Sequence, residues 1–136
     1  MINCLIITYD DMSVTLLKRA ELLTGEKTQI KALAIHPDMT QEHIRTIILK
    51  EISNNNTKET LILTDIFGSP HMKSILSLPG CFKVISGVNL PMVISVKKAL
   101  LKGETDLNNL VSIVLSETQE SIMEKTLQHL HVTKEI

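Results

Sequence analysis

Aromatic residues are scarce in this chain, whose 136 residues include no Trp, one Tyr and two Phe. A core with almost no large rings must consist of closely packed aliphatic side chains. The few aromatic residues therefore stand out, and Tyr9 and Phe67 both fall where an expected strand ends. These two positions are the first candidates for a function other than packing.

The chain also lacks an excess of charge of either sign. Its 14 Lys and Arg residues nearly balance 15 Asp and Glu residues, and the formal net charge is −1. No surplus of cations is therefore available to neutralise a nucleic-acid backbone or an anionic membrane surface. We expect no nucleic-acid partner.

Long apolar runs and linkers are missing as well. Stretches such as Cys4 to Ile7 and Leu61 to Leu63 are far shorter than a bilayer requires, and no basic segment precedes a long apolar one at the amino terminus. No stretch rich in Pro, Gly or Ser divides the chain. The sequence predicts one domain over residues 1–130 and a tail over residues 131–136, in a cytoplasmic protein that is not inserted in a membrane.

The two cysteines have neither the spacing of metal ligands nor that of a redox motif. Cys4 lies in an apolar segment and Cys81 follows a Pro-Gly turn, so we expect two buried or half-buried thiols. His43, His129 and His131 lie in helical or tail segments without a carboxylate or cysteine at ligand spacing. We therefore expect no metal and no cofactor.

Strand-like and helix-like patterns alternate along the chain. Residues 1–8 form a nearly continuous apolar run, typical of a strand that helices cover on both faces, and further strands are expected at 29–35, 60–64 and 82–86. Helical spacing predicts helices at 12–24, around 44–52, at 70–76, from 91 to about 101, and from about 106 through Leu130. The alternation predicts an α/β fold with an open, mainly parallel four-stranded sheet, helices on both faces and room for a carboxyl-terminal strand.

Helix ends carry their own signals. Ser13 is expected to cap the start of the first helix and Gly25 to end it. Asp38 or Thr40 can cap the second helix. Asp10 and Asp11, which precede the first helix, favour its dipole.

In open parallel sheets, ligands bind beyond the carboxyl ends of the strands. Residues 8–11, 36–38, 65–71 and 86–91 are expected there. Asp65 stands at a strand end before a tight turn, and Ser69 and Pro70 follow at a helix start, an arrangement that presents backbone N–H groups to an anion. A plainer interpretation is that Asp65 and Ser69 only cap the turn.

Three stretches together resemble a known family: residues 16–26 (LLKRAELLTGE), 63–70 (LTDIFGSP) and 84–92 (VISGVNLPM). In order and spacing they resemble the IIA component of the mannose family of the bacterial sugar phosphotransferase system, over residues 1 to about 126. The resemblance implies a four-stranded parallel sheet, usually in a homodimer, sometimes with a carboxyl-terminal strand exchanged between subunits, a role open to the tail from His131. It also implies two partners, the histidine-containing phosphocarrier protein as phosphoryl donor and the IIB component as acceptor.

The sequence departs from this family at the phosphorylated residue. Members carry the phosphoryl group on a histidine just after the first strand, oriented by a carboxylate at the end of the third. Ungapped matching puts Tyr9 in place of the histidine and Asp65 in place of the carboxylate, while Ser69 and Pro70 match the loop that borders the pocket. That loop is one glycine shorter than the usual form.

This substitution disfavours phosphoryl transfer for a chemical reason. A phenol has a pKa of about 10, and the difference of about three pK units from an imidazole corresponds to roughly 4 kcal/mol at neutral pH. The nearby carboxylate of Asp65 would disfavour the phenolate further. The sequence therefore predicts a degenerate IIA-like protein that acts in regulation or docking.

Two other residues leave an alternative open. His71, in the first turn after Ser69 and Pro70, is the one histidine expected to reach the same pocket, and a working phosphoryl carrier would use it as a substitute acceptor. The competing interpretation is that His71 is a solvent-facing histidine on a short helix. His36 is interpreted as a turn residue. The candidate catalytic residues are thus Tyr9, Asp65, Ser69 and His71.

Two further classes of function remain. Asp10, Asp11, Asp65 and Ser86 resemble the acidic pocket of a two-component receiver domain, in which Mg²⁺ assists phosphorylation of a carboxylate, here Asp65. Receivers place a lysine after a fifth parallel strand, whereas here Pro91 begins a helix that includes Lys97 and Lys98. A structural dimerisation module with an inert pocket is the third class.

Overall fold

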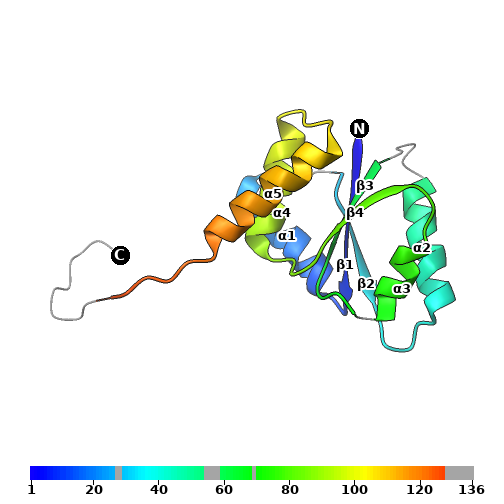
Figure 1. The fold of residues 1–136 in the computed structure, drawn as a ribbon. Coiled ribbons are helices and arrows are strands. Elements are labelled where there is room, and N and C mark those ends of the chain that lie inside the picture. Colours follow the sequence, from blue (N-terminus) through cyan, green and yellow to red (C-terminus); the bar gives the residue numbers. More distant parts are fainter. Residues whose placement is uncertain (27–28, 54–58, 69, 128–136) are drawn as a thin grey trace.

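A four-stranded parallel sheet forms the middle layer of the structure (Figure 1). The computed structural model describes residues 1–26, 29–53, 59–68 and 70–127. The strands are β1 (Ile2–Tyr9), β2 (Lys31–Ile35), β3 (Glu59–Thr64) and β4 (Cys81–Ile85). They lie in the order β2-β1-β3-β4, and each neighbouring pair is parallel. The expected α/β fold is confirmed.

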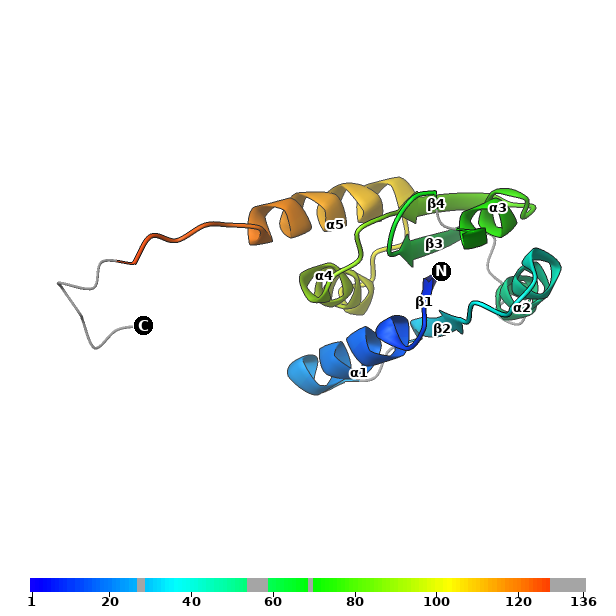
Figure 2. The ribbon, with the colours of Figure 1, turned by 90° about the horizontal axis from the view of Figure 1, so that it is seen from below.

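Helices cover both faces of this sheet (Figure 2). One face carries α1 (Met12–Thr24), α4 (Leu90–Leu101) and α5 (Leu107–Ser121), and the other carries α2 (Gln41–Ser53) and α3 (Pro70–Leu76). Within the described residues, no helix is long and apolar enough to cross a membrane.

Two aliphatic clusters explain why β1 is apolar throughout. Cys4 and Ile6 face the cluster beneath α1, α4 and α5, while Leu5 and Ile7 face the cluster beneath α2 and α3. All four side chains are at most 1% exposed. Burying each such side chain contributes about 1.5–3 kcal/mol, so the two clusters hold the central strand from both sides.

The amino-terminal end of α1 differs from the prediction. Asp11 occupies the N-cap position without a capping hydrogen bond from its side chain. Ser13 does not cap the helix, because it is buried and its Oγ donates to the Leu33 carbonyl of β2 at 2.8 Å. The other end follows the prediction, since Gly25 adopts a left-handed φ of 72°.

The last helix is shorter than its apolar pattern suggested. It ends at Ser121, and residues 122–127 are not helical. Ile122, Met123 and Leu127 are each more than 60% exposed, so their side chains gain no burial to hold another turn, and most helical stability comes from such packing. Leu130, the tail from residue 131 and the expected boundary at residue 130 lie outside the described residues.

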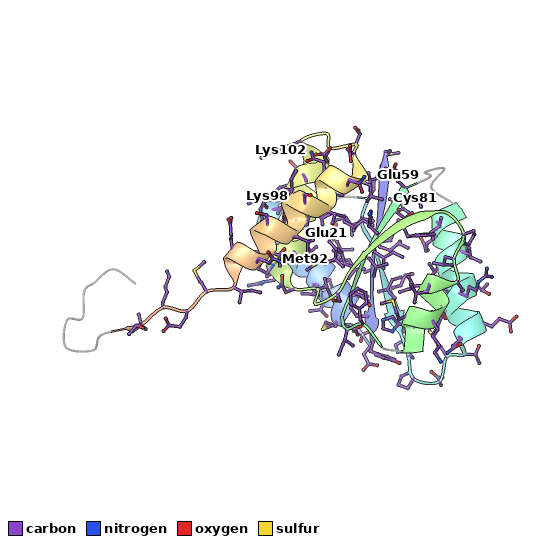
Figure 3. All side chains as sticks on the ribbon, viewed as in Figure 1. Glu21, Glu59, Cys81, Met92, Lys98 and Lys102 are labelled. Atoms are coloured by element: carbon purple, nitrogen blue, oxygen red, sulfur yellow. The ribbon has the colours of Figure 1, made fainter. Side chains whose placement is uncertain are left out.

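The cysteines differ from each other. Burial raises the pKa of the Cys4 thiol to about 12. Cys81 is exposed, contrary to expectation, because it opens the edge strand β4 opposite Glu59 (Figure 3).

Candidate functional site

Tyr9 and Asp65 meet at the carboxyl edge of the two inner strands. Tyr9 is the last residue of β1, and Asp65 follows the last residue of β3. The Tyr9 backbone N–H donates to Oδ2 of Asp65 at 3.0 Å, and the Ile66 N–H donates to Oδ1 at 2.8 Å. The Asp65 carboxylate thus orders the turn after β3 and ties it to β1, which is the capping role considered from the sequence.

His71 reaches the same carboxylate from α3. Its Nε2 lies 3.2 Å from Oδ1 of Asp65 and 2.8 Å from the hydroxyl oxygen of Thr64. The Thr64 hydroxyl lies 3.2 Å from Asp65 Oδ1 and donates to it. Because the Thr64 hydroxyl uses its one proton for Asp65, its oxygen can only accept a hydrogen bond from His71. We therefore place the imidazole proton on Nε2. The nitrogen facing Asp65 is therefore a donor and carries no lone pair for attack on phosphorus.

The interpretation of His71 as solvent-facing is wrong. The residue is 0% exposed, and its ring packs edge-on against Tyr9 with centroids 5.2 Å apart and an interplanar angle of 73°. A polar side chain can be buried when partners satisfy it, and Thr64 and Asp65 supply them. His71 on α3 consequently points into the protein.

The ionisation of both groups follows from these contacts. Burial lowers the pKa of His71, and this effect outweighs the Asp65 carboxylate, which raises it. For Asp65, burial alone would raise the pKa, but hydrogen bonds from the Tyr9 and Ile66 N–H groups, the charge of His71 and the Thr64 hydroxyl together lower it. At neutral pH the pair is therefore a neutral imidazole beside a carboxylate.

The loop after Asp65 presents apolar side chains. Ile66 is 62% exposed and Phe67 is 55% exposed. Gly68 takes a φ of 92°, a conformation that favours glycine in this tight turn. Pro70 begins α3, whereas Ser69 lies outside the described residues.

A second histidine belongs to this edge, and the sequence reasoning did not assign it a function. Nδ1 of His36 lies 3.8 Å from Oδ1 of Asp10, and both side chains are exposed. Pairing β1 with β2 so that Tyr9 faces Ile35 places residues 10 and 36 side by side. Only a prediction of this strand register could have revealed the pair from the sequence.

The carboxylates do not form the acidic pocket of a receiver domain. Asp10 turns toward His36, whereas Asp65 binds backbone N–H groups and His71. Among the residues that the structure describes, no three His, Cys, Asp or Glu side chains are placed to hold a metal ion.

Comparison with known proteins agrees with this architecture. A family model described as PTS system fructose IIA component, EIIA-man, matches residues 3–115. The comparison with curated proteins found no match.

Several solved structures share the fold. A phosphotransferase system component EIIA from Streptococcus agalactiae is 24% identical with a TM-score of 0.77, covering 91% of this chain and 97% of that one. A mannose/sorbose specific IIA subunit from Enterococcus faecalis is 17% identical with a TM-score of 0.77, covering 95% and 98%. A PTS IIA protein associated with the fucose utilization operon of Streptococcus pneumoniae is 18% identical with a TM-score of 0.71, covering 90% and 92%.

Proposed function

This chain belongs to the EIIA-man family of phosphotransferase-system IIA components, and from that premise we propose that it docks on proteins of the system without relaying a phosphoryl group through the Tyr9 pocket. Its docking partners are the phosphocarrier protein and the IIB component. Docking without relay through that pocket makes the protein a regulator of the system.

The contact between His71 and Asp65 carries this proposal. In the mannose family the corresponding carboxylate orients the phosphorylated imidazole, and here the place of that imidazole falls to Tyr9. Asp65 is instead engaged by two backbone N–H groups, Thr64 and His71. An incoming phosphoryl group would therefore meet a phenol and a carboxylate that is already hydrogen-bonded.

His71 is poorly suited to act as a substitute acceptor. Its ring is fully buried behind Tyr9, and the nitrogen nearest the pocket carboxylate holds its proton between Thr64 and Asp65. Transfer to His71 would require the start of α3 to leave the sheet. A phosphoryl carrier working through His71 is the alternative that the experiment below must test.

The surroundings of the pocket support docking. Ile66 and Phe67 are exposed beside Asp65, and Met12 is 43% exposed at the start of α1. A few well-packed side chains near the centre of a contact, often large and aromatic, contribute most of the binding energy between proteins. Family membership further leads us to propose a cytoplasmic homodimer, whose subunit number light scattering would measure.

Titrating the isotope-labelled protein with unphosphorylated phosphocarrier tests docking directly. We expect amide shifts at Tyr9, Ile66 and Phe67, and none at the opposite edge near Leu101. A parallel incubation with phosphoenolpyruvate, the first enzyme of the system and the phosphocarrier should leave Tyr9 and His71 without phosphate when the product is mapped by mass spectrometry.

Two results would overturn this proposal. Absence of docking to both the phosphocarrier and the IIB component would indicate an inert dimerisation module. Acid-labile phosphate on His71, or radiolabel passing through this chain to the IIB component, would indicate a working carrier.

A further inference from the structure

His36 stands one strand away from the Tyr9 pocket, on the same edge of the sheet. Ile35 is the register partner of Tyr9, and the Asp10 N–H donates to the Ile35 carbonyl at 2.9 Å. Neighbouring strands are about 4.8 Å apart. A protein docked over Tyr9 is therefore within one strand spacing of the backbone that carries His36.

A carboxylate lies beside one edge of this imidazole. Nδ1 of His36 faces Oδ1 of Asp10 at 3.8 Å. Asp10 has a φ of 51°, the one positive φ outside glycine among the described residues, and Asp tolerates this region better than most residues. A carboxylate beside Nδ1 favours the proton on that nitrogen, which leaves the lone pair on Nε2.

Exposure together with a neighbouring carboxylate separates His36 from the other described histidines. Its side chain is 48% exposed, whereas His71 is fully buried. His43 on α2 is exposed, but in the described part of the chain the two histidine–carboxylate pairs are those of His36 and His71. His36 thus combines an accessible ring with a neighbouring carboxylate.

We propose that His36 is a phosphoryl-acceptor site, modified on Nε2 by the phosphohistidine of a docked phosphocarrier. The lone pair of Nε2 forms the new N–P bond, and the P–N bond of the donor breaks with its electron pair returning to the donor imidazole. The proton on Nδ1 stays beside Asp10, whose carboxylate faces the positive charge that develops on the ring. This site rests on the docking proposed above and is separate from the Tyr9 pocket.

The modification would act on docking, because the edge has few cations to balance it. Residues 9–12, 36–40, 65–70 and 86–89 include four Asp and no Lys or Arg. A phosphoryl group adds between one and two further negative charges near pH 7. Like charges repel an incoming phosphorylated partner. The protein phosphorylated on His36 should therefore bind the phosphorylated carrier more weakly than the unmodified protein does.

The test uses the full chain with phosphoenolpyruvate, the first enzyme and the phosphocarrier, followed by site mapping under alkaline conditions that preserve phosphohistidine. We expect one acid-labile phosphoryl group on His36, lost in His36→Gln and retained in His43→Gln, the matched exposed control. Asp10→Asn, which keeps a residue that accepts positive φ, should label about tenfold more slowly because the ring loses the neighbouring negative charge.

Docking is measured separately, so the two proposals can fail independently. His36→Gln should still shift the amides of Ile66 and Phe67 on titration with the phosphocarrier. Docking without phosphate on His36 refutes the acceptor site and leaves the proposed function standing. If no docking occurs, phosphoramidate replaces the phosphocarrier as the phosphoryl donor in a second test of the acceptor site. Labelling of His36 no faster than that of His43 also refutes the site. Faster labelling of His36 that slows in Asp10→Asn supports it.

Discussion

Nε2 of His71 lies 3.2 Å from Oδ1 of Asp65, inside the protein and behind the ring of Tyr9. The resemblance to the mannose family implied an imidazole–carboxylate pair between the ends of the first and third strands. Here the pair forms between the end of β3 and the first turn of α3. The Asp65 carboxylate also accepts a hydrogen bond from the Tyr9 backbone N–H, and the imidazole is buried away from solvent.

Replacing His71 should destabilise the fold. His71→Ala removes a fully buried ring and leaves Thr64 with one partner fewer, so we expect a loss of about 2–4 kcal/mol in the free energy of unfolding. Urea denaturation measures it. His43→Ala, at an exposed position on α2, should change the same quantity by less than about 0.5 kcal/mol.

The stability should also depend on pH through His71. Its folded pKa lies below the ordinary value of 6.5 because burial disfavours the charged ring. The contribution of the neutral ring is therefore fully present above pH 6.5 and is lost as the pH falls from there through the folded pKa. Urea midpoints between pH 7.5 and 5 should fall for the natural sequence and fall less for His71→Phe. Equal slopes in the two proteins would contradict this assignment.

Asp65 adds a second pH dependence at lower pH. Its pKa is lowered from 3.8, so its contribution is present above that value and is lost as the pH falls through the folded pKa. Asp65→Asn should remove this acid-side loss, and Asp11→Asn, at an exposed position, should retain it. Acid titration followed by far-UV circular dichroism distinguishes the two variants.

Introducing a histidine at position 9 should not by itself produce relay. Tyr9→His supplies an imidazole after β1, but Asp65 remains engaged by His71. We expect rapid phosphorylation at position 9 only when His71→Phe is added, a non-additive result typical of residues that share a partner. Site-mapped phosphate from the phosphocarrier provides the measurement, and rapid labelling of the single Tyr9→His variant would count against competition for Asp65.

Docking should depend on the exposed loop after β3. Phe67→Ser removes a 55% exposed ring next to the pocket and should weaken phosphocarrier binding by about tenfold. Leu101→Ser is the matched control, because Leu101 is 53% exposed at the end of α4 and distant from this loop. Isothermal titration of both variants compares their affinities.

Much of the fold could be predicted because its signals are local. Continuous apolar runs identify strands covered on both faces, and the spacing of Ile44, Ile48 and their neighbours identifies a helix. Gly25 ended its helix as predicted. The end of α5 could not be found this way, since helical spacing continues past Ser121 while the described chain offers Ile122 and Met123 no burial.

The site was harder to predict because its contacts cross elements. Tyr9 and Asp65 were placed correctly at neighbouring strand ends, which follows from parallel topology. The burial of His71 depends on how α3 rotates against β3, and seven residues of sequence do not determine that rotation. The pairing of His36 with Asp10 required the register between β1 and β2, which the sequence pattern does not specify.

The position of β1 and β3 between two other strands has a kinetic consequence. Because β1 and β3 are each paired on both sides, the amides in the middle of these two strands should exchange hydrogen mainly through large-scale unfolding. The strands beneath the docking surface would then already be ordered before a partner protein binds. The ordering entropy of association would come almost entirely from the short loop that carries Ile66 and Phe67.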